Sequence, residues 1–428
     1  MKHVVLLKSR SNNHGGLEKY ASRIAKAFIE RGSRVTILTT GKALRHSEIP
    51  VVATKTIPWP AFARMEQFDW FVRKWLKKNG ADLVFGMDRN RYQTHIRAGN
   101  GVHAAYLKSR ILTEGKMKAL FCELNPLHRK ILELEKAAFE NPALQKLFTN
   151  SHMVRNQVLE HYAVEPDKVQ VIHNGVEWKE METDFSSWES RKAEGLKKFF
   201  LDPNQFHFLF IGNGYLRKGL DRLLLALSQL KNESFHLSVI GKDNQMDLFR
   251  AKAIQLGLKD QVHFFGPSQE IRLFYQLADC LVIPSFYDPF ANVTVEALAM
   301  GLFVLSSKLN GGHEILTPAI NQGGKQVTIS ASEAKQNRFS QCRTVLRTAC
   351  IEESDLAKPQ QADCHLSTPL VNNGAVIEDL LDPDAMVDAL RIAIKNKKTA
   401  RSAEQIRNSV KHLDFSNQLR ILMESCHG

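Results

Sequence analysis

Two cationic residues follow a glycine turn near the middle of the chain. The stretch GNGYLRKG, residues 212–219, comes directly after an apolar run typical of a buried strand. Glycines at a strand end let backbone amides approach a phosphate, and the helix that follows presents its positive amino end. The adjacent charges of Arg217 and Lys218 could neutralise a departing diphosphate without a metal ion. The stretch is not a Walker loop, because Leu220 stands where that loop has lysine.

Two carboxylates occur in the stretch PSFYDPFANVTVEALAMG, residues 284–301. Asp288 lies in a loop after a predicted strand, and Glu296 lies in a helix that begins near Phe290. Both therefore fall near one helix amino terminus at the carboxyl edge of a sheet, where open α/β sheets bind ligands. Alternatively, Asp288 caps the helix and Glu296 is an exposed helical residue. The apolar neighbours of Glu296 favour burial, and a buried carboxylate needs partners such as ribose hydroxyls.

Strand and helix patterns alternate along most of the chain, which predicts parallel sheets covered by helices on both faces. A first unit runs from a strand at 3–8 through glycines 15 and 16 into an amphipathic helix, and then to a strand at 34–40. A second strand that runs into a glycine turn and a helix begins at 206–212. The 428 residues allow two or three domains at about 150 residues each. We predict an α/β protein with two doubly wound domains.

The charge, hydropathy and cysteine content limit which partners and which location are expected. Lys and Arg number 58 against 45 for Asp and Glu, and this formal charge of +13 attracts a polyanion. No apolar run is long enough to cross a membrane, and the first strand is too short for a signal peptide, so we expect a cytoplasmic location. The six cysteines are far apart without a Cys-x-x-Cys pair, which predicts free thiols. Asp382 and Asp384 have a spacing known from manganese sites, but Pro383 between them indicates a helix start; we predict no metal site.

Basic residues gather in one stretch of the amino-terminal half, residues 101–130, together with apolar ones. This mixture is typical of an amphipathic element lying on an anionic bilayer. It also fits a solvated helical face beside an acceptor cleft. Neither a basic recognition helix nor aromatic interleaving of a nucleic-acid type is apparent, so we expect no nucleic-acid partner. The cations are Lys108, Arg110, Lys116, Lys118, Arg129 and Lys130.

The motifs in combination resemble the retaining GT-B glycosyltransferases of family 4, in particular the lipopolysaccharide core glucosyltransferases. The similar features are GGLE at 15–18, RKG at 217–219 and the two acids at 288 and 296 followed by Ala-x-x-x-Gly. Further similar stretches are TNS at 149–151, VIHNGV at 171–176 and VHFFG at 262–266. The resemblance implies two Rossmann-like domains facing a cleft. It also implies transfer of a hexose, glucose from UDP-glucose, to a saccharide or glycolipid acceptor with no other cofactor.

In such a fold we expect an amino-terminal acceptor domain at 1–170 and a nucleotide-sugar domain at 171–402. The carboxyl-terminal helix, 403–428, is expected to pack back on the first domain. Residues 320–372 sustain no period and are rich in Gln, Ser, Lys and Asn, which predicts an irregular insertion.

The resemblance also implies roles for single residues. The glycines at 15 and 16 should approach the diphosphate from the first domain, and Arg217 and Lys218 should hold it from the second. The segment 263–266 should contact the base, Glu296 the ribose and Asp288 the transferred sugar. The family usually has Glu and Gly where this chain has Asp288 and Ala291. The predicted donor site is therefore Gly15, Gly16, Gly212, Arg217, Lys218, His263, Phe264, Asp288, Phe290, Ala291, Asn292 and Glu296.

The resemblance implies chemistry on one face of the sugar, with the leaving phosphate drawing the acceptor proton and no enzyme nucleophile. His103 lies where the family often keeps a polar residue, and its imidazole could donate to a sugar hydroxyl or a phosphate. A structural histidine, or Asn100 in its place, is the alternative. His313 either borders the donor or caps a helix. The predicted catalytic residues are Arg217, Lys218, His103 and Asp288.

Two other functions stay open from the sequence. A nucleotide-sugar epimerase can share the two-domain fold, but it needs an acid/base pair facing the sugar, and no second catalytic carboxylate is evident in the amino-terminal half. A non-catalytic, basic membrane-binding module is the third hypothesis, kept open by the charge and by Asp288 and Ala291.

Overall fold

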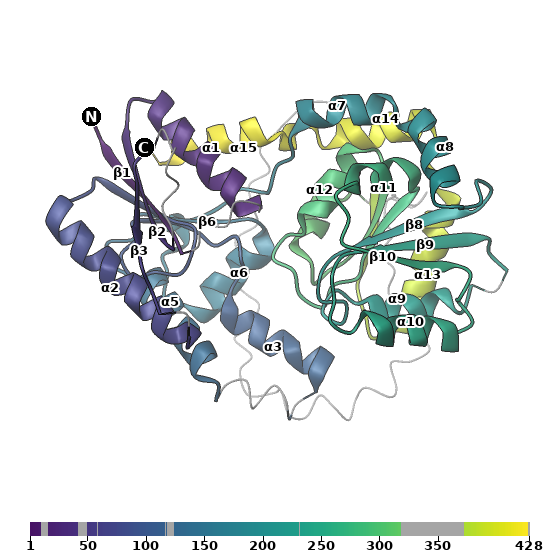
Figure 1. Ribbon diagram of the computed structural model, residues 1–428, viewed down its shortest axis with the longest axis horizontal. Helices are drawn as coiled ribbons and strands as arrows, with labels where there is room; N and C mark the ends of the chain where they lie inside the picture. The colour runs from purple at the N-terminus through teal and green to yellow at the C-terminus, as the bar shows by residue number, and fades with distance from the viewer. Residues whose placement is uncertain are drawn as a thin grey trace, which may run out of the picture.

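The computed structural model consists of two parallel β-sheets, each covered by helices on both faces (Figure 1). It describes residues 1–9, 16–41, 49–57, 59–115, 117, 124–230, 232–317 and 372–426. The predicted insertion at 320–372 therefore lies outside the described residues, apart from its last position, as do Gly15, Lys116 and Lys118. Among the described residues, no helix combines the length and apolar character needed to cross a bilayer.

The first sheet has seven strands in the order β3-β2-β1-β4-β5-β6-β7, and all neighbours are parallel. The central strand β1 is buried at every position, as expected of a strand covered on both faces. The strands are β1 (His3–Lys8), β2 (Arg34–Thr40), β3 (Val51–Thr54), β4 (Leu83–Gly86), β5 (His95–Arg97), β6 (Lys146–Thr149) and β7 (Val169–Val171).

Successive side chains of β1 enter different cores, because a strand projects alternate residues to opposite faces. Val4 and Leu6 pack with α1 (Gly16–Glu30), whereas Val5 and Leu7 pack with α2 (Ala61–Asn79). Among the described residues, this half also contains α3 (His103–Glu114), α5 (Pro126–Phe139) and α6 (His152–His161), and a helix from the carboxyl-terminal region joins them.

The second sheet has six strands in the order β10-β9-β8-β11-β12-β13, again all parallel. Both sheets thus have the reversal of strand order that defines doubly wound folds. The strands are β8 (Phe206–Ile211), β9 (Phe235–Ile240), β10 (Val262–Gly266), β11 (Cys280–Ile283), β12 (Phe303–Ser307) and β13 (Gly374–Ile377).

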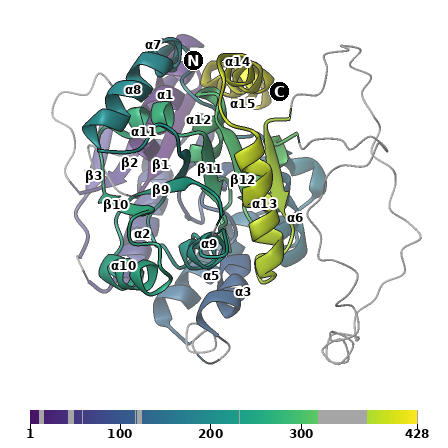
Figure 2. The same ribbon diagram turned by 90° about the vertical axis from the view of Figure 1, so that its right-hand side faces the viewer.

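Helices form a layer on each face of the second sheet (Figure 2). One layer contains α9 (Leu220–Leu227), α10 (Met246–Gln255) and α13 (Pro383–Lys395). The other contains α7 (Trp178–Ser186), α8 (Trp188–Lys198), α11 (Ile271–Leu277), α12 (Asn292–Ala299) and α14 (Ala400–Ser409).

The carboxyl-terminal region forms two helices, so the prediction of one helix at 403–428 is wrong. The helix α14 ends at Ser409, a short 3-10 turn follows, and α15 covers Phe415–Ser425. Ile406 packs in the core of the second half, whereas Leu422 and Met423 pack beneath α1 in the first. Only α15 therefore returns to the amino-terminal sheet, and the pair of helices runs along one edge of the molecule (Figure 1).

Candidate functional site

A cavity of about 760 Å³ lies between the two halves of the molecule. On the first side it is lined by residues that follow strand ends, including Met87 after β4 and Asn100 after β5. On the second side it is lined by residues of α11 and α12, among them Arg272 and Glu296. Because loops at the carboxyl ends of parallel strands meet at one edge of a sheet, the two doubly wound folds place polar side chains around this space.

The predicted cations and the predicted first acid form one cluster. Lys218 Nζ lies 2.5 Å from Asp288 Oδ2, and Arg217 lies 3.5 Å from the same oxygen and donates to the carbonyl of Tyr287. The turn depends on Gly219, which has φ of 78° and would place a Cβ 1.8 Å from the carbonyl oxygen of Pro284. Only glycine fits such a left-handed, crowded position without rearrangement.

The ion pair is largely removed from water. Lys218 is 8% exposed and Asp288 is 9% exposed, so each depends on the other for charge compensation. The interpretation of Asp288 as the cap of α12 is wrong, because the N-cap is Ala291 and no side chain caps that end. The family resemblance implies that the cations hold phosphate and the acid holds the sugar; in this structure the cations and the acid bind each other.

Glu296 is half-buried on α12 and not an exposed helical residue. Its Oε2 accepts a hydrogen bond of 2.7 Å from the hydroxyl of Tyr275. Burial raises the pKa of Glu296, although the Tyr275 hydrogen bond and the nearby Arg272 lower it in part. The carboxyl borders the cavity, where it can accept hydrogen bonds from hydroxyl groups.

Asn292 links α12 to the first sheet. Its Oδ1 accepts a 2.6 Å hydrogen bond from Asn174, whose own Oδ1 accepts one of 2.7 Å from Arg97. All three residues line the cavity. Sequence analysis missed Arg97 and Asn174 as site residues; Asn174 lies in the quoted VIHNGV stretch, which was the available signal. The neighbouring Phe290 and Ala291 are buried in the core beneath α12.

His103 is the first residue of α3 and does not line the described cavity, whereas Asn100 does. Its Nε2 lies 3.0 Å from Nδ1 of His128, and its backbone amide donates to the buried carboxylate of Glu135. Burial, followed by the charges of Arg89, His128 and Arg110, lowers the pKa of His103 to about 3. The imidazole of His103 is therefore neutral at physiological pH, and its Nε2 is already in contact with His128.

The other predicted residues are distributed around the second sheet. His263 lies on the edge strand β10, where its Nδ1 is 2.8 Å from Nε2 of His236, and neither it nor Phe264 lines the cavity. Gly212 packs under the side chain of Lys218. Gly16 begins α1, two turns before cavity-lining Arg23.

Two alternatives raised by the sequence find a structural answer. His313 Nδ1 lies 2.9 Å from the carbonyl oxygen of Asn310 within a 3-10 turn that is capped by the Asn310 side chain, so His313 neither caps the turn nor lines the described cavity. Asp382 caps α13 by accepting from the amide of Asp384, with Pro383 in the first turn. The Asp-x-Asp spacing is thus explained by helix capping.

Two family models match the sequence. Glycosyltransferase Family 4 matches residues 14–179, and Glycosyl transferases group 1 matches residues 192–336. An uncharacterised glycosyltransferase of Methanocaldococcus jannaschii is 26% identical over 324 residues, 72% of this chain and 80% of the relative. The lipopolysaccharide glucosyltransferase WaaG of Escherichia coli is 27% identical over 309 residues, 69% of this chain and 78% of the relative.

Solved structures agree in fold. The crystal structure of WaaG, a glycosyltransferase involved in lipopolysaccharide biosynthesis, superposes with a TM-score of 0.68 at 19% identity, covering 98% of both chains. HepE of Anabaena, in complex with UDP and glucose, superposes with a TM-score of 0.60 at 15% identity over the whole of both chains. The two parallel sheets, the cavity between them and the family matches on both halves lead to one conclusion: the chain belongs to the GT-B glycosyltransferases of family 4 and group 1.

Proposed function

We propose that the chain is a retaining hexosyltransferase that moves glucose from a UDP-sugar to a saccharide or lipid-linked acceptor. The observation that carries this proposal is the cavity between the two sheets, bordered by the Glu296 carboxyl, with the Arg217, Lys218 and Asp288 cluster on the same half. The names of the relatives support the class of donor and acceptor. WaaG is a lipopolysaccharide glucosyltransferase, and HepE was solved with UDP and glucose.

In the proposed reaction, Glu296 accepts hydrogen bonds from the ribose and Arg217 holds the diphosphate. Arg217 is the more accessible cation, with 37% of its side chain exposed against 10% for Lys218. Lys218 is shared between Asp288 and the diphosphate, so Asp288 is fixed where it can accept from a hydroxyl of the transferred sugar. The two cations compensate the charge that develops on the leaving group, as oriented charges do in other transfer enzymes.

The acceptor is proposed to lie at an anionic membrane on the cytoplasmic side, next to α3 and α5. Three of the described cations there already have acidic partners: Lys108 pairs with Glu160, Arg110 with Glu114, and Lys130 with both Glu66 and Glu133. Exposed apolar side chains lie among them, including Ile111, Leu112 and Leu124. Apolar insertion would therefore contribute together with charge, and vesicle binding should be reduced but not abolished by high salt.

One experiment tests the function. The purified protein is incubated with UDP-glucose and a lipopolysaccharide core acceptor, and free UDP and the product anomer are measured. The proposal expects UDP release that depends on the acceptor and a product with the anomeric configuration of the donor. Conversion of the donor to another sugar nucleotide without UDP release would indicate an epimerase. Absence of UDP binding would favour a non-catalytic membrane module.

A further inference from the structure

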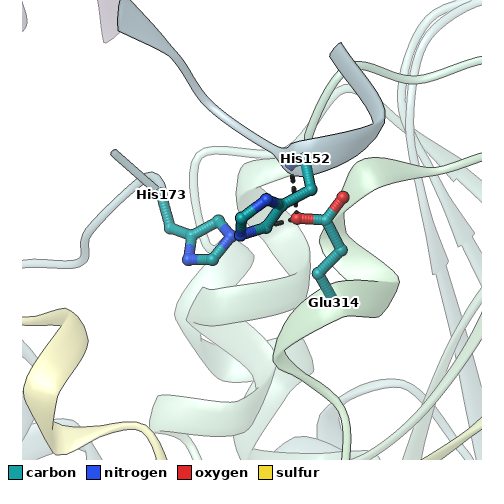
Figure 3. A group of neighbouring side chains, drawn as sticks. All are labelled: His152, His173 and Glu314. Carbon is teal, nitrogen blue, oxygen red and sulfur yellow. Dashed lines mark hydrogen bonds and ion pairs between the residues drawn. The ribbon is translucent and has the colours of Figure 1, made fainter. Parts of the chain in front are cut away.

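Three residues with metal-binding side chains meet at the boundary between the two halves (Figure 3). His152 is the first residue of α6, His173 follows β7, and Glu314 lies in the 3-10 turn after β12. One ligand atom from each lies within 4.8 Å of the others. The three residues are far apart in the sequence, so no motif of fixed spacing predicted the cluster.

The distance between two of the ligand atoms suits a tetrahedral ion. His173 Nε2 lies 3.1 Å from Glu314 Oε2. In a tetrahedral zinc site with bonds of 2.0–2.1 Å, neighbouring ligand atoms are about 3.3 Å apart. An ion can therefore replace the hydrogen bond between these two side chains with little movement of either. His152 is exposed, so its ring can turn toward the same point and solvent can reach it.

The Glu314 carboxylate also accepts hydrogen bonds from the protein backbone. Its two oxygens accept hydrogen bonds of 2.7 Å from the backbone amides of His152 and Met153. Such outer hydrogen bonds orient a metal-binding carboxylate. They also satisfy the amino end of α6 without help from either imidazole, so helix capping explains Glu314 but does not explain why two histidines converge on it.

We propose that His152, His173 and Glu314 form a binding site for a divalent transition-metal ion, with Zn²⁺ the best match. Two imidazoles and one carboxylate are a common zinc ligand set, and the fourth position is left to water. Two of the ligands belong to the first half and one belongs to the second. The ion thus ties the halves together, and because His173 also lines the cavity, it does so at the cavity edge.

The proposal rests on the geometry of the three side chains alone, so it does not depend on the proposed function. A bound ion should restrain separation of the two halves and raise the stability of the folded protein, since any ligand that binds only the folded state does so.

The test uses the full chain, freed of metal with a chelator. Zn²⁺ affinity is measured by competition with a chromophoric chelator, and Co²⁺ is then added as a spectroscopic probe. The variants are His152→Ala and His173→Gln, with His161→Gln at the other end of α6 as the matched control. We expect one ion per chain and a loss of affinity of at least tenfold in both site variants, the smallest loss usual even for residues that only support a ligand.

The control should bind as the parent does, and Zn²⁺ should raise the melting temperature of parent and control but not of the site variants. Because His152 is exposed, His152→Ala should fold like the parent without metal, so this variant decides the matter even if His173→Gln is unstable. Equal affinity in the parent and His152→Ala would refute the site. A thiolate-to-cobalt charge-transfer band would also refute it, since it would assign the ion to cysteine.

Discussion

The buried ion pair between Lys218 and Asp288 offers the most demanding test. Lys218→Met removes the charge and keeps most of the side-chain length, which leaves Asp288 in a position that is only 9% exposed. Breaking a buried pair from one side typically costs about 3–5 kcal/mol. Arg217, 3.5 Å from the same carboxylate oxygen, remains as a partial partner, so the lower end of about 3 kcal/mol is expected.

The same substitution should also reduce turnover. Loss of one oriented electrostatic group typically costs about 10²- to 10³-fold in rate. The burial of the pair adds a folding cost of similar size. The loss of stability and the loss of turnover can be separated. The loss of stability requires the unpaired Asp288 carboxylate, whereas the loss of turnover does not.

The double variant Lys218→Met with Asp288→Asn provides the separation. With both charges removed, no uncompensated carboxylate is buried, so the free energy of unfolding measured in urea should return most of the way to the parental value. The value of kcat/KM for the UDP-sugar should stay low, because the diphosphate still lacks its cation and the transferred sugar also lacks the Asp288 carboxylate. If the double variant regains full activity, Lys218 serves only to neutralise Asp288. If Lys218→Met is as stable as the parent, the reasoning from burial is wrong.

Three further outcomes are expected. Glu296→Gln should weaken UDP binding about tenfold in calorimetry with little change in melting temperature, since the amide retains the shape but is a poorer acceptor; unchanged affinity would return Glu296 to a structural role. Gly219→Ala should destabilise the fold by about 1–3 kcal/mol or more in urea, and more than Gly257→Ala, because both glycines have positive φ but only a Cβ at 219 meets a backbone oxygen, that of Pro284; equal losses would contradict this. Burial lowers the pKa of His236 to about 3, below the unfolded value of 6.5. Because the unfolded chain then binds a proton that the folded protein does not, the stability present above pH 6.5 falls by about 1.4 kcal/mol per pH unit as pH drops toward 3. The NMR ring signals of His236 should not titrate between pH 7.5 and 5, and a midpoint near 6.5 would refute the assignment.

The amino-acid sequence determined the features that depend on neighbours along the chain. The alternation of apolar strands and amphipathic helices predicted two parallel α/β sheets, because periodicity reports which faces are buried. The Asp382 cap was predicted for the same reason: capping joins residues two positions apart. The glycine turn at 212–219 was also local, and Gly219 does adopt the left-handed conformation that the turn needs.

Tertiary structure decided the features that depend on distances between remote segments. Lys218 and Asp288 are 70 positions apart, and nothing in either motif indicated that they pair rather than bind separate ligands. His103 contacts His128 because α5 packs beside α3, and the period of apolar residues along the sequence could not show this contact. The helical chain breaks before α15 because residues 410–414 pass from the second half of the molecule to the first. There, Val176 exchanges backbone hydrogen bonds with Leu413 and Phe415. Charge pairing and burial act through space, so these contacts are fixed only when the remote segments that carry them have folded against each other.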